Sequence, residues 1–172
     1  MDRRLRPSQM DRATFVATFG HVFEESPWIA ATAYDLGLPE DADRAEGLLR
    51  ALCAVLREAD AEQQRRLIDA HPDLAGRLAR VGQLTADSTR EQAGAGLDRL
   101  SDEEYQRFTA LNEAYRARFG FPFIMAIKGR TKEEILEAFE RRLAHDEATE
   151  FQAALAQIER IALLRLTDLL PS

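Results

Sequence analysis

A histidine stands in a turn-forming stretch of the first half of the chain, Asp69-Ala70-His71-Pro72-Asp73-Leu74. Proline disfavours helical conformation in the residue before it, so we expect His71 at the end of a helix, with two carboxylates nearby in sequence. Imidazole is the side chain best suited to move protons near neutral pH. The stretch predicts either a proton-transferring histidine or a histidine that merely caps a helix beside a turn.

A second candidate is the polar helix start Ser88-Thr89-Arg90-Glu91-Gln92. A hydroxyl followed three residues later by Glu is typical of a capping box, which gives Glu91 a structural role. An acid–base carboxylate would look the same, and periodicity does not separate the two. The small residues that follow, Ala93-Gly94-Ala95-Gly96, would let a ligand approach backbone N–H groups, which favour anions.

Two apolar stretches complete the candidate set. Arg165 lies within Ile161-Ala162-Leu163-Leu164-Arg165-Leu166, where an unpaired buried charge would be costly, so we expect a partner. That partner is either a structural carboxylate or a polar group of a substrate. The run Gly120-Phe121-Pro122-Phe123-Ile124-Met125-Ala126-Ile127 favours a buried central segment, or a pocket wall that presents backbone donors to a polar ligand.

Other chemistries find little support. The three histidines, His21, His71 and His145, have no metal-ligand spacing, and one cysteine cannot form a disulfide or a cysteine-based zinc site. Cys53 lies among leucines in a helical stretch, which favours a buried and inert thiol. Gly94-Ala95-Gly96 follows no predicted strand and is not taken as a nucleotide-binding loop. We therefore expect no metal.

Composition decides which elements must position these residues. The chain has 172 residues, 45% hydrophobic and 31% charged, and a formal net charge of -7. Alanine and leucine dominate the apolar set, and both favour helices over strands. We expect an all-α protein, a single compact domain of about seven to nine helices over residues 1–172, with 1–8 a loose N-terminal segment. The acidic charge argues against nucleic-acid or membrane partners, and without a readable secretory signal we expect a cytoplasmic protein.

Apolar spacing and helix caps predict where the helices lie. The helix that begins at Ser101 is expected to bury Tyr105, Phe108, Leu111, Asn112 and Tyr115. Capping boxes are predicted at Ser88, Ser101 and Thr131. The predicted helices are a first amphipathic one over Phe15–Phe23, then Trp28–Leu36, Leu48–Leu56, Ala61–Asp69, Ser101 to about Gly120, one from Thr131 through Leu143, and Glu147–Leu169.

The order and separation of several motifs make the chain resemble the 2-oxo-4-hydroxy-4-carboxy-5-ureidoimidazoline (OHCU) decarboxylase family. The resemblance runs along nearly the whole chain. Its motifs are Phe19-Gly20-His21-Val22-Phe23-Glu24-Glu25-Ser26-Pro27-Trp28, His71-Pro72-Asp73-Leu74-Ala75-Gly76, Leu84-Thr85, Ser88-Thr89-Arg90-Glu91-Gln92, Ala95-Gly96-Leu97, Leu111-Asn112-x-x-Tyr115, Phe119-Gly120-Phe121-Pro122-Phe123-Ile124 and Leu164-Arg165-Leu166.

The resemblance implies an all-α enzyme without a cofactor, usually a homodimer, that decarboxylates OHCU to (S)-allantoin in urate and purine degradation. The family's catalytic histidine falls on His71 and its acidic partner on Glu91. Its substrate contacts fall on Pro72, Ser88, Thr89, Arg90, Glu91, Gln92, Phe123, Ile124, Met125, Ala126, Ile127 and Arg165. The contacts of Phe123–Ile127 are implied to run through backbone groups.

Two other functions remain open at this stage. One is a non-catalytic helical interaction module, in which His71, Glu91 and Arg165 share no cavity. The other is a related ureide-processing lyase or hydrolase on the same scaffold. A pocket that joins the three residues would favour an enzyme.

Overall fold

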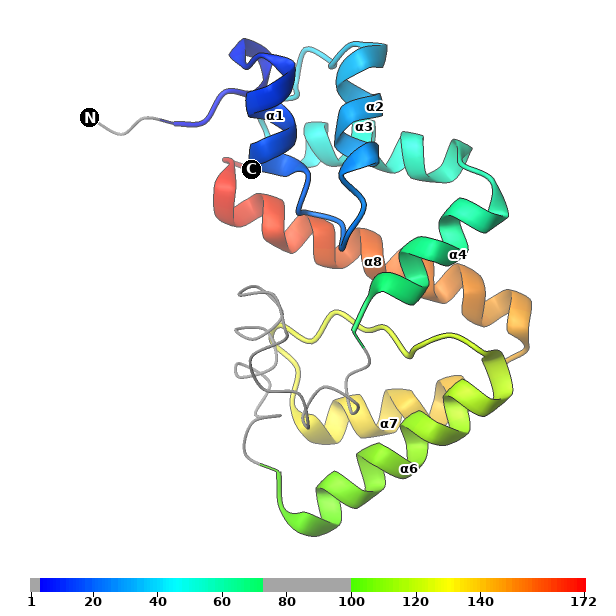
Figure 1. Ribbon diagram of the computed structural model, residues 1–172. Helices are drawn as coiled ribbons and strands as arrows, with labels where there is room; N and C mark the ends of the chain where they lie inside the picture. The colour runs from blue at the N-terminus through cyan, green and yellow to red at the C-terminus, as the bar shows by residue number, and fades with distance from the viewer. Residues whose placement is uncertain (1–3, 73–99) are drawn as a thin grey trace. The chain divides into compact units, whose positions relative to one another are not determined.

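The computed structural model describes residues 4–72 and 100–172, and within these ranges every regular element is a helix (Figure 1). The all-α prediction is confirmed. Across the two described ranges, no helix is both long and apolar enough to span a bilayer. The elements are η1 (Pro7–Gln9), α1 (Arg12–Phe19), α2 (Pro27–Leu36), α3 (Ala45–Glu58), α4 (Ala61–Ala70), α6 (Asp102–Phe119), α7 (Lys132–Leu143) and α8 (Glu147–Leu169).

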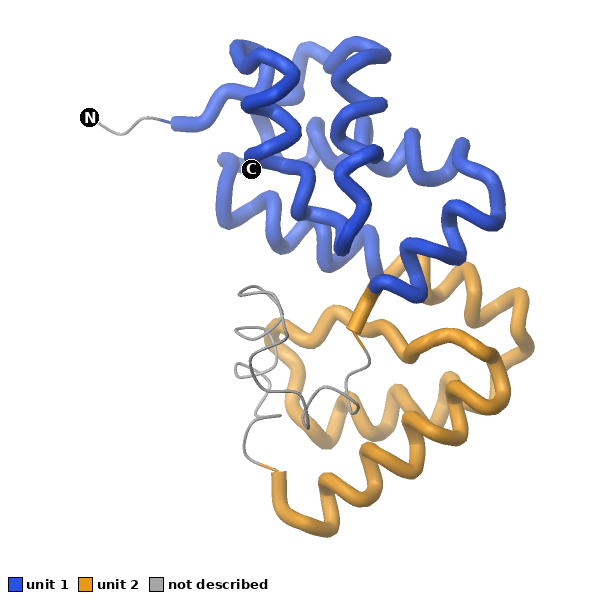
Figure 2. The backbone as a smooth tube through the Cα atoms, viewed as in Figure 1, with its two compact units in different colours: residues 1–70, 158–172 blue, residues 71–157 orange. Residues whose placement is uncertain are grey.

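The chain divides into two compact units, coloured separately in Figure 2. Unit 1 comprises Met1–Ala70 and Ile158–Ser172, and unit 2 comprises His71–Gln157. Helix α8 therefore contributes residues to both. The domain boundaries and the loose segment over 1–8 stay predictions.

Unit 1 is built around the aromatic side chains of α1 and α2. The rings of Phe15 and Phe19 lie 5.2 Å apart, and Phe15 also contacts Tyr34. Helix α1 ends at Phe19, earlier than predicted, yet Val22 and Phe23 are buried in the turn that follows. A turn can therefore bury the apolar residues that the spacing assigned to a longer helix.

A glycine lets α3 pack closely against the turn before it. A Cβ atom built on Gly47 would collide with the backbone and side chain of Asp41. Because glycine has no Cβ, the first turn of α3 can lie directly against this turn.

Unit 2 has an aromatic core around Tyr115 of α6. Its ring makes edge-to-face or tilted contacts with the rings of Phe119, Phe121, Phe123 and Phe139. Such geometries are favoured by the ring quadrupole and add to the apolar area that is buried. The core keeps Phe123, which lies outside any helix, against α6 and α7.

Burial along α6 differs from the prediction at its start. Phe108, Asn112 and Tyr115 are buried, but Tyr105 is 38% exposed. The first turn of the helix carries exposed polar residues, so the buried stripe begins one turn later than the spacing predicted. Leu111 is half-buried.

Of the two predicted capping boxes in the described residues, the one at Ser101 is complete, whereas the one at Thr131 shows only its hydroxyl half. Ser101 and Glu104 form a reciprocal capping box, and Gly120 ends α6 in the left-handed conformation with φ 77°. Thr131 accepts a hydrogen bond from the Glu134 backbone N–H at 3.2 Å. The box predicted at Ser88 lies outside the described residues.

The capping box makes a testable contribution to stability. We expect Ser101→Ala to lower the free energy of unfolding by about 1 kcal/mol, because the α6 N–H groups lose an acceptor, while Ser101→Gly costs a few tenths. Urea denaturation followed by circular dichroism measures both. Equal midpoints for wild type and Ser101→Ala would show that the cap contributes nothing.

Candidate functional site

His71 lies directly after α4, as the following proline predicted. Helix α4 ends at Ala70, and His71 is 5% exposed. Pro72 follows it and is half-buried. A buried imidazole at a helix end is a suitable environment for a directed proton transfer, because water does not compete for the group.

Several predicted residues lie outside the described part of the chain, namely Ser88, Thr89, Arg90, Glu91 and Gln92. His71 belongs to unit 2 and Arg165 to unit 1, and each unit is described by itself. The convergence of His71, Glu91 and Arg165 therefore stays a prediction.

The segment Phe123–Ile127 is the buried central segment that its sequence favoured. Phe123, Ile124, Ala126 and Ile127 are at most 4% exposed, and Met125 is half-buried. The segment lies between α6 and α7 and has no helical structure. Its peptide groups therefore need hydrogen-bond partners from elsewhere.

Two side chains supply such partners. Nη1 of Arg142 donates to the Ile124 carbonyl at 2.6 Å, and the Ala126 N–H donates to Oε1 of Gln157 at 2.9 Å. Arg142 belongs to α7 and Gln157 to α8, and both are in unit 2. Two helices thus hold the segment through its backbone.

Arg142 belongs to a buried polar cluster centred on Glu150, which is fully buried. The Glu150 carboxylate accepts from the Tyr115 hydroxyl at 2.6 Å and from Nε of Arg142 at 2.9 Å, and His145 Nδ1 lies 2.8 Å away. Burial, and then the hydrogen bond to Glu150, raises the pKa of Tyr115 well above its ordinary value. The phenol therefore remains a proton donor to the carboxylate across the physiological range.

Sequence reasoning missed this cluster, although one signal was available. Ile135, Ala138 and Phe139 define the buried stripe of α7, and Arg142 occupies the next position of that stripe. An arginine on an apolar stripe implies a buried partner, which is the argument the sequence allowed for Arg165.

Arg165 is paired with a carboxylate, one of the two kinds of partner left open. Its Nη2 lies 3.1 Å from Oε1 of Glu24, and its Nη1 donates to the Val22 carbonyl at 3.3 Å. Arg165 and Glu24 are each 5% exposed. Sequence reasoning did not single out Glu24, although a Glu flanked by Phe23 and Pro27-Trp28 was a signal of burial.

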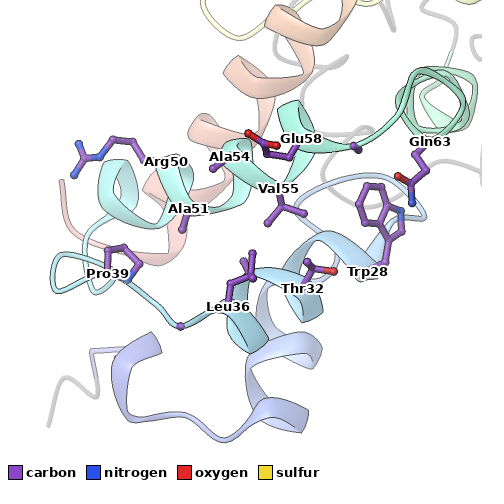
Figure 3. Close-up of a pocket in the computed structure, with 13 residues that line it drawn as sticks. Trp28, Thr32, Leu36, Pro39, Arg50, Ala51, Ala54, Val55, Glu58 and Gln63 are labelled. Atoms are coloured by element: carbon purple, nitrogen blue, oxygen red, sulfur yellow. The ribbon is translucent and has the colours of Figure 1, made fainter.

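A cavity of about 620 Å³ lies within unit 1, between α2, α3 and the start of α4 (Figure 3). Leu36 and Val55 line its middle, and Trp28 lies beside Gln63 at one end. No residue predicted for the site lines it. It is mostly apolar, and Leu36 is 76% exposed.

Cys53 is half-buried and not buried as the sequence predicted, but burial and the neighbouring Glu159 carboxylate raise the pKa of the thiol far above its usual range. A protonated thiol is a poor nucleophile. Within residues 4–72 and 100–172, His, Cys, Asp and Glu side chains do not form a group of three or more able to hold a metal ion.

Comparisons with known proteins agree on one family. The sequence profile described as OHCU decarboxylase matches residues 8–167. The 2-oxo-4-hydroxy-4-carboxy-5-ureidoimidazoline decarboxylase of Haloferax volcanii is 42% identical over 161 residues, which cover 94% of this chain and 92% of the relative. The uric acid degradation bifunctional protein PucL of Bacillus subtilis is 43% identical over 95% of this chain, which spans 32% of that protein.

A crystal structure of (S)-allantoin synthase has a similar fold. The TM-score is 0.73 at 29% sequence identity, and the match covers 95% of this chain and 52% of that one. The chain therefore spans about half the length of this solved relative.

The Glu24–Arg165 pair provides a stability test. We expect Glu24→Gln to lower the free energy of unfolding by about 3 kcal/mol, because it leaves a buried guanidinium without a counter-charge. The double variant Glu24→Leu/Arg165→Met removes both charges and should recover much of this loss. Chemical denaturation checks both variants. A double variant that is no more stable than Glu24→Gln would show that the buried guanidinium does not depend on this counter-charge.

Proposed function

The chain belongs to the OHCU decarboxylase family, and on that premise we propose that it converts OHCU to CO2 and (S)-allantoin in urate degradation. The observation that carries this proposal is the match of the family profile to residues 8–167, nearly the whole chain. The substrate is a small anionic heterocycle, and the reaction class is carbon–carbon lyase.

The substrate itself explains why the proposed reaction needs no cofactor. The carbon that bears the carboxylate also bears a hydroxyl and adjoins a ring C=N bond. When the bond to the carboxylate breaks, CO2 leaves, and the electron pair moves into the ring to form a C=C bond. The ring nitrogen takes up one proton, which gives an enol. The enol oxygen then gives up its proton, and the ureido-bearing carbon takes one up, which gives allantoin.

We assign the proton transfers of this reaction to His71 and Glu91. His71 accepts the hydroxyl proton, supported by Glu91, and the pair delivers a proton to one face of the enol, which sets the S configuration. The burial of His71 supports this role, because a proton held away from bulk water can be directed to one face.

The remaining predicted residues bind the substrate in this proposal. Arg165 and the helix start Ser88–Gln92 hold its polar groups, Pro72 lies beside the catalytic histidine, and Phe123–Ile127 contributes backbone groups. Arginine suits planar, bidentate recognition of a carboxylate. The Glu24 carboxylate supports the role of Arg165, because an ion pair keeps the guanidinium oriented within an apolar environment.

A cytoplasmic location and a homodimer are part of the same proposal. The apolar cavity of unit 1 and the exposed Leu36 give the chain a surface that a second copy would bury. Sedimentation velocity measures the assembly, and a monomer at micromolar concentration would contradict the dimer.

A coupled stereochemical assay tests the activity. Purified protein is added to urate, urate oxidase and hydroxyisourate hydrolase, and circular dichroism follows the appearance of (S)-allantoin. We expect a signal far faster than the spontaneous reaction, which yields racemic product. A rate no greater than this background would contradict the enzyme proposal and favour the interaction module. Product formation from other ureides instead would favour the related lyase or hydrolase.

The proposed role of His71 is tested in the same assay. We expect His71→Asn to lower kcat by about 100-fold or more, because asparagine cannot accept the proton. The far-ultraviolet spectrum should stay that of a helical protein. Activity close to that of the wild type would show that another group moves the proton.

A further inference from the structure

The backbone of Phe123–Ile127 is held at two points by side chains that the sequence analysis did not single out. The Ile124 carbonyl accepts from Arg142, and the Ala126 N–H donates to Gln157. Both bonds are made inside unit 2 to a buried segment that lacks the internal hydrogen bonds of a helix. Each therefore fixes the orientation of a peptide group that could otherwise rotate.

Arg142 is itself firmly placed. It is 7% exposed, its Nε donates to the buried Glu150, and its guanidinium carbon lies 4.4 Å from the centre of the Phe123 ring. One guanidinium therefore contacts the segment twice, through the Ile124 carbonyl and through the Phe123 ring. A planar group with several fixed donors can do this, whereas an ammonium group is a single point charge.

We propose that Arg142 and Gln157 are positioning residues that hold the backbone of Phe123–Ile127 in the orientation in which it binds the substrate. This inference rests on the proposed function. Arg142 and Gln157 act through the backbone and do not touch the substrate. Their loss should weaken substrate binding and leave the proton chemistry at His71 largely intact.

Gln157 offers the sharper test, because it is half-buried and can be replaced without removing a charge. Gln157→Met keeps the size of the side chain and removes the acceptor for the Ala126 N–H, whereas Gln157→Glu keeps an acceptor. In the coupled assay at pH 8, we expect Gln157→Met to raise KM about 5–10-fold with kcat within about twofold of wild type. Gln157→Glu should stay within about twofold in both parameters.

Two further variants separate positioning from general stability. Gln106→Met changes an exposed glutamine of α6 and should leave both parameters unchanged. Arg142→Lys keeps a charge opposite Glu150, but one ammonium group cannot serve Glu150 and the Ile124 carbonyl with the same geometry, so KM should rise here as well. Thermal unfolding of each variant shows the folded fraction.

The outcomes are distinguishable from those of the parent proposal. An inactive wild-type enzyme overturns the proposed function itself. With an active wild type, an unchanged KM in Gln157→Met overturns the positioning role. A parallel loss of kcat and melting temperature in Gln157→Met and Gln157→Glu also overturns it, because that pattern is the one a purely structural role produces.

Discussion

A buried stretch of chain outside any helix must find hydrogen-bond partners for its peptide groups, and this requirement shapes unit 2. The segment Phe123–Ile127 meets it with Arg142 and Gln157. Burial of Arg142 in turn requires a counter-charge, which Glu150 provides. The carboxylate of Glu150 also accepts from Tyr115. The aromatic core, the polar cluster and the irregular segment are therefore one cooperative arrangement.

Unit 1 follows the same physical logic around a second buried arginine. Arg165 pairs with Glu24 and also bonds the Val22 carbonyl, as Arg142 pairs with Glu150 and also bonds the Ile124 carbonyl. In each case one guanidinium neutralises a buried carboxylate and holds a non-helical backbone. Buried charges that are paired and hydrogen-bonded are costly to remove one at a time, so both arrangements resist local change.

Some features of the candidate site were predictable from the sequence, and others were not. Proline after His71 indicated the end of a helix, because that effect acts between neighbouring residues. The apolar run through Phe123 indicated a buried segment, and the flanks of Arg165 indicated a partner. The identity of that partner, Glu24, was not predictable, because the two residues are 141 positions apart in the chain. The contacts of Arg142 and Gln157 with this segment were missed for a related reason, because they join residues 18 and 31 positions apart in the chain.

The sequence by itself determined the all-α class, most helix boundaries and their caps, since these depend on side-chain propensities and on bonds within one turn of helix. Its motifs also determined the family. Tertiary structure decided which polar groups meet inside the units. It pairs Glu24 with Arg165 in a buried ion pair, and it brings Tyr115 and Arg142 within hydrogen-bond distance of Glu150. The physical reason is that pairing of buried charges depends on distances in the folded chain, and local spacing does not encode those distances.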